Sequence, residues 1–87
     1  MKFASAVTWT PKAAKQLRKL DVQFQKQVLD ATQTLAAMPN CQNVVALTSH
    51  HYGYRLRVGN FRVLFDWSSV IKIVSIEEVK KRDESTY

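Results

Sequence analysis

The sequence predicts a small α+β domain, in which a two-helix hairpin packs on one face of a mostly antiparallel sheet. Apolar residues recur at helical spacing in the segment 11–38, whereas from Val44 onward short apolar runs alternate with polar residues, as in strands. A length of 87 residues suits one domain and not two. We therefore expect residues 1–87 to form a single domain with the order β-α-α-β-β-β.

The first strand and both helices are predicted in the segment 2–38. Residues 2–9 (KFASAVTW) form the first expected strand. Thr10 can cap the following helix, Pro11 suits its first turn, and the helix carries an apolar stripe. Asp21 is placed to cap a second helix, which runs from Val22 to about Met38 and stops before a Pro-Asn pair. Because the helices are nearly contiguous, we expect a helical hairpin.

The second half of the chain predicts strands. VVAL (44–47) is a short apolar run, YRLRV (54–58) and FRVLFDW (61–67) alternate, and VIKIVSI (70–76) closes the sheet. The pair Gly59-Asn60 favours a tight hairpin turn between the two alternating segments. A slip of one residue would mix polar and apolar side chains on both faces, so the pattern predicts one register.

In that register Arg57 lies opposite Arg62, with Arg55 on the same face. Like charges that face each other across a sheet destabilise it. The competing interpretation is that Asp66, diagonal to Arg55, and Glu77, near Arg62 on the next strand, pair with these arginines, but two acids would leave a surplus of positive charge. Guanidinium groups match phosphate oxygens with forked donors, so the face predicts an anion site.

Composition and net charge narrow the classes of partner and site that this chain can have. The net charge of +6 favours a polyanion or an acidic protein as partner. One cysteine excludes a disulfide framework, and neither an acidic cluster nor spaced histidines predict a metal. We expect no cofactor. No apolar segment is long enough to cross a membrane, and a cytoplasmic protein is expected.

The segments GYRLRVGNFRVLF and IVSIEEVKKRDESTY resemble the RelE/ParE superfamily of toxins from type II toxin–antitoxin systems. The resemblance covers essentially the whole chain and rests on the Y-R-L-R-V-G-x-F-R core and the terminal K-R-x4-Y. It is closest to RelE-like mRNA interferases, ribosome-dependent endoribonucleases that cut mRNA without a metal. It implies three partners: a cognate antitoxin, the ribosome and mRNA.

The resemblance also implies site residues. Arg62 matches the arginine that holds the scissile phosphate, Arg82 matches a second cation, and Tyr87 matches a C-terminal tyrosine that acts on or stacks against the nucleotide. Arg55 stands where RelE has a lysine. Attack of a 2′-OH on the phosphate builds negative charge that fixed cations stabilise. Three more residues are expected to bind RNA: Arg57, Lys80 and Lys81.

At two positions this sequence departs from the RelE pattern, so the residues that would transfer protons are not assigned. Arginine is a poor acid or base, and Gly53 stands where RelE has a further basic residue. The remaining candidates for proton transfer are Tyr87, Lys80, Lys81, His50, His51 and Glu77. Two other functions remain possible at this point: a ParE-like poison of DNA gyrase without nuclease activity, and a non-toxic RNA-binding module.

Overall fold

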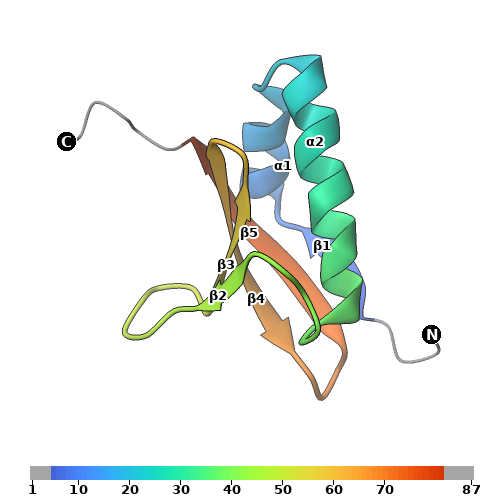
Figure 1. The fold of residues 1–87 in the computed structure, drawn as a ribbon, viewed down its shortest axis with the longest axis vertical. Coiled ribbons are helices and arrows are strands. Elements are labelled where there is room, and N and C mark those ends of the chain that lie inside the picture. The colour runs from blue at the N-terminus through green and yellow to red at the C-terminus, as the bar shows by residue number, and fades with distance from the viewer. Residues whose placement is uncertain (1–4, 82–87) are drawn as a thin grey trace.

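The computed structural model describes residues 5–81, and within this range it has five strands, two α-helices and one 3-10 helix (Figure 1). In chain order these are β1 (Ala6–Trp9), α1 (Pro11–Arg18), α2 (Val22–Gln33), the 3-10 helix η1 (Thr34–Ala37), β2 (Val44–Ala46), β3 (Tyr54–Val58), β4 (Phe61–Ser68) and β5 (Ile73–Lys81).

The strands form one sheet in the order β1-β5-β4-β3-β2. The β1–β5 pair is parallel and the other three pairs are antiparallel. Both α-helices lie on one face of this sheet and carry the chain from its β1 edge to its β2 edge (Figure 1). The predicted α+β architecture is therefore confirmed, with the short apolar run at 44–46 as an additional edge strand.

The predicted hairpin register is confirmed. Arg57 pairs with Arg62, Val58 with Phe61, and the ladder continues in the same register to Tyr54 and Phe65. Gly59 has a φ of 54°, whereas Asn60 is not in the left-handed region. Positive φ at only the first central residue is the pattern of a type II′ turn, where glycine is favoured.

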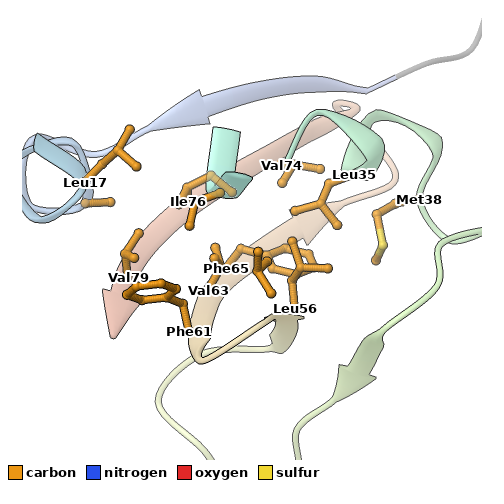
Figure 2. Close-up of a cluster of buried hydrophobic side chains, with 13 residues drawn as sticks. Leu17, Leu35, Met38, Leu56, Phe61, Val63, Phe65, Val74, Ile76 and Val79 are labelled. Carbon is orange, nitrogen blue, oxygen red and sulfur yellow. The ribbon is translucent and has the colours of Figure 1, made fainter. Parts of the chain in front are cut away.

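The core lies between the helices and the apolar face of the sheet (Figure 2). Val63 and Phe65 of β4 are fully buried, in the same cluster as Val28 of α2 and Leu35 of η1. Burial of each such side chain stabilises the fold by about 1.5–3 kcal/mol. The apolar face of the hairpin is thus covered by helices, as predicted, and the arginine face points away from them.

Both helical caps were predicted, but only one uses its side chain. The Thr10 hydroxyl accepts a hydrogen bond from the Ala13 amide at 3.1 Å, with Pro11 in the first turn. Asp21 occupies the N-cap position of α2, but its side chain makes no capping hydrogen bond. The helix also ends sooner than predicted, at Gln33, because the backbone tightens there into η1.

The boundaries of the last strand were predicted wrongly. The strand begins at Ile73 rather than Val70 and continues to Lys81. Val70 is 86% exposed in the turn that follows β4. This turn ends at Lys72, whose φ is 57°. The strand extends through a charged stretch because its backbone pairs with β4 as far as Phe61. The first strand begins at Ala6, and residues 2–4 lie outside the described range.

Candidate functional site

Three cationic residues lie in a row across the three central strands. Arg57 of β3 is opposite Arg62 of β4, and Arg62 is opposite Lys80 of β5. Neighbouring strands are about 4.8 Å apart, so the three side chains leave the sheet close together. Arg55, two residues before Arg57 on β3, has its side chain on the same face. We call these four residues the cationic face.

The arginines of the cationic face have no acidic partner within residues 5–81. None of the guanidinium groups of Arg55, Arg57 and Arg62 forms a hydrogen bond or ion pair in that range. Arg57 is exposed, while Arg55 and Arg62 are half-buried. Their donors are therefore available to an anion that approaches the side of the sheet opposite the helices.

The two candidate acidic partners bind elsewhere. Asp66 accepts a hydrogen bond from the Gly53 amide at 2.7 Å, and Glu77 accepts one from the Ser75 hydroxyl at 2.9 Å. The placement of Glu77 beside Arg62 was wrong because β5 contains a bulge. Leu64 pairs with Glu78 and the next residue, Phe65, pairs with Ile76, so Glu77 is the extra residue.

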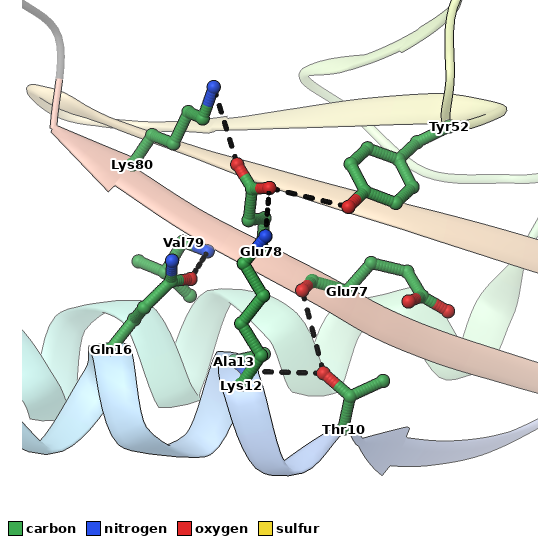
Figure 3. A network of polar contacts seen from close by, with 9 residues as sticks. All are labelled: Thr10, Lys12, Ala13, Gln16, Tyr52, Glu77, Glu78, Val79 and Lys80. Atoms are coloured by element: carbon green, nitrogen blue, oxygen red, sulfur yellow. Dashed lines mark hydrogen bonds and ion pairs between the residues drawn. The ribbon is translucent and has the colours of Figure 1, made fainter.

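The bulge places Glu78 on the cationic face, beside Lys80 (Figure 3). The Glu78 side chain is buried and binds three groups from three parts of the chain. Its Oε2 lies 2.7 Å from Nζ of Lys12 in α1 and accepts a hydrogen bond from the Tyr52 hydroxyl at 3.3 Å. Its Oε1 lies 3.3 Å from Lys80 Nζ, an ion pair without hydrogen-bond geometry.

These contacts shift the protonation equilibria. The Lys12 hydrogen bond, helped by Lys80 and opposed by burial, lowers the pKa of the Glu78 carboxyl. Burial and the nearby Glu78 charge raise the pKa of the Tyr52 hydroxyl. Glu78 is therefore an anion, and Tyr52 a neutral hydrogen-bond donor, at neutral pH. Sequence reasoning missed Glu78, because simple alternation does not reveal which of two adjacent glutamates is the bulged one.

The two adjacent lysines of β5 lie on opposite faces. Lys80 belongs to the cationic face, but Lys81 is opposite Phe61 on the helix side of the sheet. There Lys81 lines a hollow of about 230 Å³ together with Phe24 and Gln27 of α2, Gly59, Asn60 and Phe61. Arg82 and Tyr87, the other two residues implied by the resemblance, lie outside the described residues.

The histidine pair lies in the exposed loop before β3. His50 Nδ1 accepts a hydrogen bond from the Tyr52 amide at 3.1 Å. The His51 and Tyr52 rings pack edge to face, with their centroids 4.7 Å apart. Both histidines therefore border Tyr52, whose hydroxyl reaches Glu78. The same loop ends at Gly53, where an added Cβ would lie 3.2 Å from Asp66 Oδ1.

Within residues 5–81, no three His, Cys, Asp or Glu side chains gather as metal ligands. Neither α-helix in this range has the length and apolar character needed to cross a bilayer.

Comparison with solved structures shows the fold. The chain is similar to RelE in the archaeal RelE–RelB complex from Pyrococcus horikoshii OT3, with a TM-score of 0.79 and 22% identity over 93% of this chain and 98% of that one. The isolated E. coli RelE toxin matches with a TM-score of 0.79 and 18% identity over 95% of this chain and 89% of that one. The RelBE2 toxin–antitoxin complex from Mycobacterium tuberculosis matches with a TM-score of 0.77 and 20% identity over 91% and 99%.

Comparison with curated protein sequences gives no match. The model of one protein family does match, over residues 7–84, and its description is the ParE toxin of the type II toxin–antitoxin system parDE. This match covers most of the chain, and the sheet and helices have the arrangement of the RelE toxins. The chain therefore belongs to the ParE toxin family, within the RelE/ParE superfamily of type II toxin–antitoxin toxins.

Proposed function

We propose that this toxin is a ribosome-dependent endoribonuclease, which inhibits translation by cleaving mRNA through attack of a 2′-OH on the scissile phosphate. The observation that carries the proposal is the row of Arg57, Arg62 and Lys80 across the sheet, in which the guanidinium groups have no acid partner within residues 5–81. An unpaired pair of facing arginines costs stability. A phosphate bound between them offsets that cost.

In this proposal each cation has a place in the reaction. Arg62, at the centre of the row, binds the scissile phosphate, and Arg55, diagonal to it, stabilises the charge of the pentacoordinate phosphorane. Arg57 and Lys80, on either side of Arg62, bind RNA. No metal takes part.

Three further residues complete the proposal. Arg82 follows β5 directly in the sequence and supplies the second cation. Tyr87 stacks against the nucleotide or transfers a proton. Lys81 lies on the far side of the sheet from Arg62, so it would bind RNA only where the RNA chain passes around the end of β5.

A ParE-like poison of DNA gyrase is the second candidate. The observation in its favour is the family match itself, which is to a model of ParE toxins. In this alternative the cationic face binds its target without cleaving a bond, so Arg62 contributes to affinity alone.

The experiment compares the purified toxin in two assays: cleavage of mRNA on programmed ribosomes and supercoiling by DNA gyrase. Wild-type toxin is expected to cleave ribosome-bound mRNA, and Arg62→Ala should reduce the rate by about 10²–10³. Arg57→Ala should reduce it less. Lys26→Ala removes an exposed cation of α2 that pairs with Asp30, and it serves as the control for charge alone. Intact mRNA together with blocked gyrase would establish the alternative instead.

A cognate antitoxin is the proposed protein partner. The Pyrococcus horikoshii and Mycobacterium tuberculosis structures are toxin–antitoxin complexes, and both resemble this chain in fold. The cytoplasm, where ribosomes translate mRNA, is the proposed location, and residues 1–87 are proposed to act as one toxin domain.

A further inference from the structure

Glu78 is buried, and its two carboxylate oxygens have different partners. It is 7% exposed, on the sheet face that carries the arginines. Lys12 and Tyr52 both bind Oε2, whereas Oε1 accepts no hydrogen bond and has only the Lys80 ammonium beside it among the described residues. Loss of Lys80 would leave two donors on the carboxylate, so Glu78 can stay in place while Lys80 moves.

Lys80 is free to exchange partners in a way that Glu78 is not. Its side chain is 59% exposed, and its ammonium group is a compact charge on a flexible stem. It projects from the sheet opposite Arg62, whose charge repels it. Glu78, two residues earlier on the same face of β5, holds it at 3.3 Å (Figure 3).

We propose that Glu78 is a positioning residue of the cationic face, which holds Lys80 beside Arg62 and withholds its charge until a phosphate group takes the place of the carboxylate. The cleavage part of this inference rests on the proposed nuclease function, but the coupling between Glu78 and Lys80 does not. Glu78 itself touches no substrate. It acts by setting the direction of the Lys80 side chain and the number of free cations in the row.

The first test measures binding to a 2′-O-methyl oligouridylate, a single strand that cannot be cleaved by 2′-OH attack. Each cation that contacts the phosphates of a single strand steepens the dependence of log K on log salt by about 0.7. Glu78→Gln frees Lys80, so its slope should be steeper than that of wild type by about that amount. The same substitution in a Lys80→Met background should give no increment.

The control variant is Glu77→Gln, which makes the same charge change at the adjacent residue, whose carboxylate binds Ser75. It should leave the slope at the wild-type value. Glu78→Asp retains the charge with a shorter reach and should lie between wild type and Glu78→Gln, and it carries the test if the latter does not fold. The inference would be overturned if Glu77→Gln steepened the salt slope as much as Glu78→Gln does. It would also be overturned if Glu78→Gln still steepened the slope in the Lys80→Met background. Wild-type toxin without salt-dependent binding would overturn it too.

The second test measures cleavage on programmed ribosomes. Glu78→Gln should lower kcat by up to about 10²-fold through misplacement of Lys80, although its affinity for RNA rises, and Glu78→Asp should recover part of kcat. A purely structural role would lower the folded fraction, without separating kcat from affinity. If wild type cleaves mRNA and Glu78→Gln has the wild-type kcat, the positioning role is wrong. If wild type cleaves nothing but the slopes behave as expected, only the nuclease proposal fails.

Discussion

At the level of single residues, Arg57 and Arg62 carry like charges at directly opposed positions of the sheet, an arrangement that lowers its stability. They are opposite each other in the β3–β4 ladder, and Asp66 and Glu77, the two candidate acidic partners, bind Gly53 and Ser75 instead. A directly opposed like-charge pair destabilises a sheet by about 0.2–1 kcal/mol. The cationic face therefore keeps an arrangement that the fold alone does not favour.

Arg57→Ala should consequently leave the fold at least as stable as wild type, with a gain of up to about 1 kcal/mol in the free energy of unfolding. Urea denaturation of the purified variant measures this. Arg18→Ala, which removes an exposed arginine from α1, is the control for a simple change of net charge. A clear loss of stability in Arg57→Ala would mean that this guanidinium has a partner that stabilises the free protein.

The Glu78 carboxyl makes the stability of the fold depend on pH. Its pKa in the folded protein is below the ordinary value of 4.5, mainly because of Lys12. A group with a lowered folded pKa stabilises the fold above its unfolded pKa, and that contribution is lost as the pH falls toward the folded pKa. The urea midpoint of wild type should therefore fall more steeply below about pH 4.5 than that of Glu78→Gln. Parallel curves would contradict the assignment.

At the level of elements, α1 completes the edge of β5. Strand β1 pairs with β5 only as far as Ile76, so the β5 backbone beyond that point needs another partner. Gln16 of α1 provides it, since its Oε1 accepts a hydrogen bond from the Val79 amide nitrogen at 2.7 Å (Figure 3). Helix α1 thereby covers an otherwise open edge next to the cationic face.

Gln16→Leu should lower the free energy of unfolding by about 1–3 kcal/mol, because it leaves a partly buried amide without an acceptor. Thermal melting and urea denaturation measure the loss. Lys15→Leu is the matched control, since it places the same side chain at the adjacent, exposed position of the helix. Equal effects of the two substitutions would show that the Gln16 hydrogen bond contributes nothing specific.

The turn between β3 and β4 depends on Gly59. Its φ of 54° is unfavourable for β-branched residues, and an added Cβ would lie 3.0 Å from Gln27 Nε2. Gly59→Val should lower stability by about 1–3 kcal/mol. Asn60→Ala, at the neighbouring turn position outside the left-handed region, should change the melting temperature much less. An unchanged melting temperature in Gly59→Val would contradict the turn geometry.

For the molecule as a whole, the net charge of +6 and the arginines of the cationic face, which have no acidic partner within residues 5–81, favour the approach of acidic partners. We expect the antitoxin to contribute acidic side chains to the cationic face. Charged contacts at the rim of an interface are screened by salt, so the toxin–antitoxin affinity should weaken as salt rises. Titration calorimetry at low and high salt measures this. An affinity independent of salt would argue for an apolar interface elsewhere on the toxin.

The sequence by itself determined the hairpin, its register and its two faces. Alternation has a period of two, and Gly59 allows the tight turn, so the opposition of Arg57 and Arg62 follows from residues close together in the chain. The helix start at Thr10 and Pro11 was equally local. For the same reason the arginine face could be predicted from the sequence, whereas the roles of Arg82 and Tyr87 remain predictions.

Only the tertiary structure decided the composition of that face. The bulge between β4 and β5 depends on the pairing of two whole strands, and it decides that Glu78, rather than Glu77, lies opposite Leu64 and that Lys80 lies opposite Arg62. The burial of Glu78 depends on Lys12 and Tyr52, which reach it from α1 and from the loop before β3. No local pattern encodes such contacts, because they come from residues up to 66 positions apart in the chain.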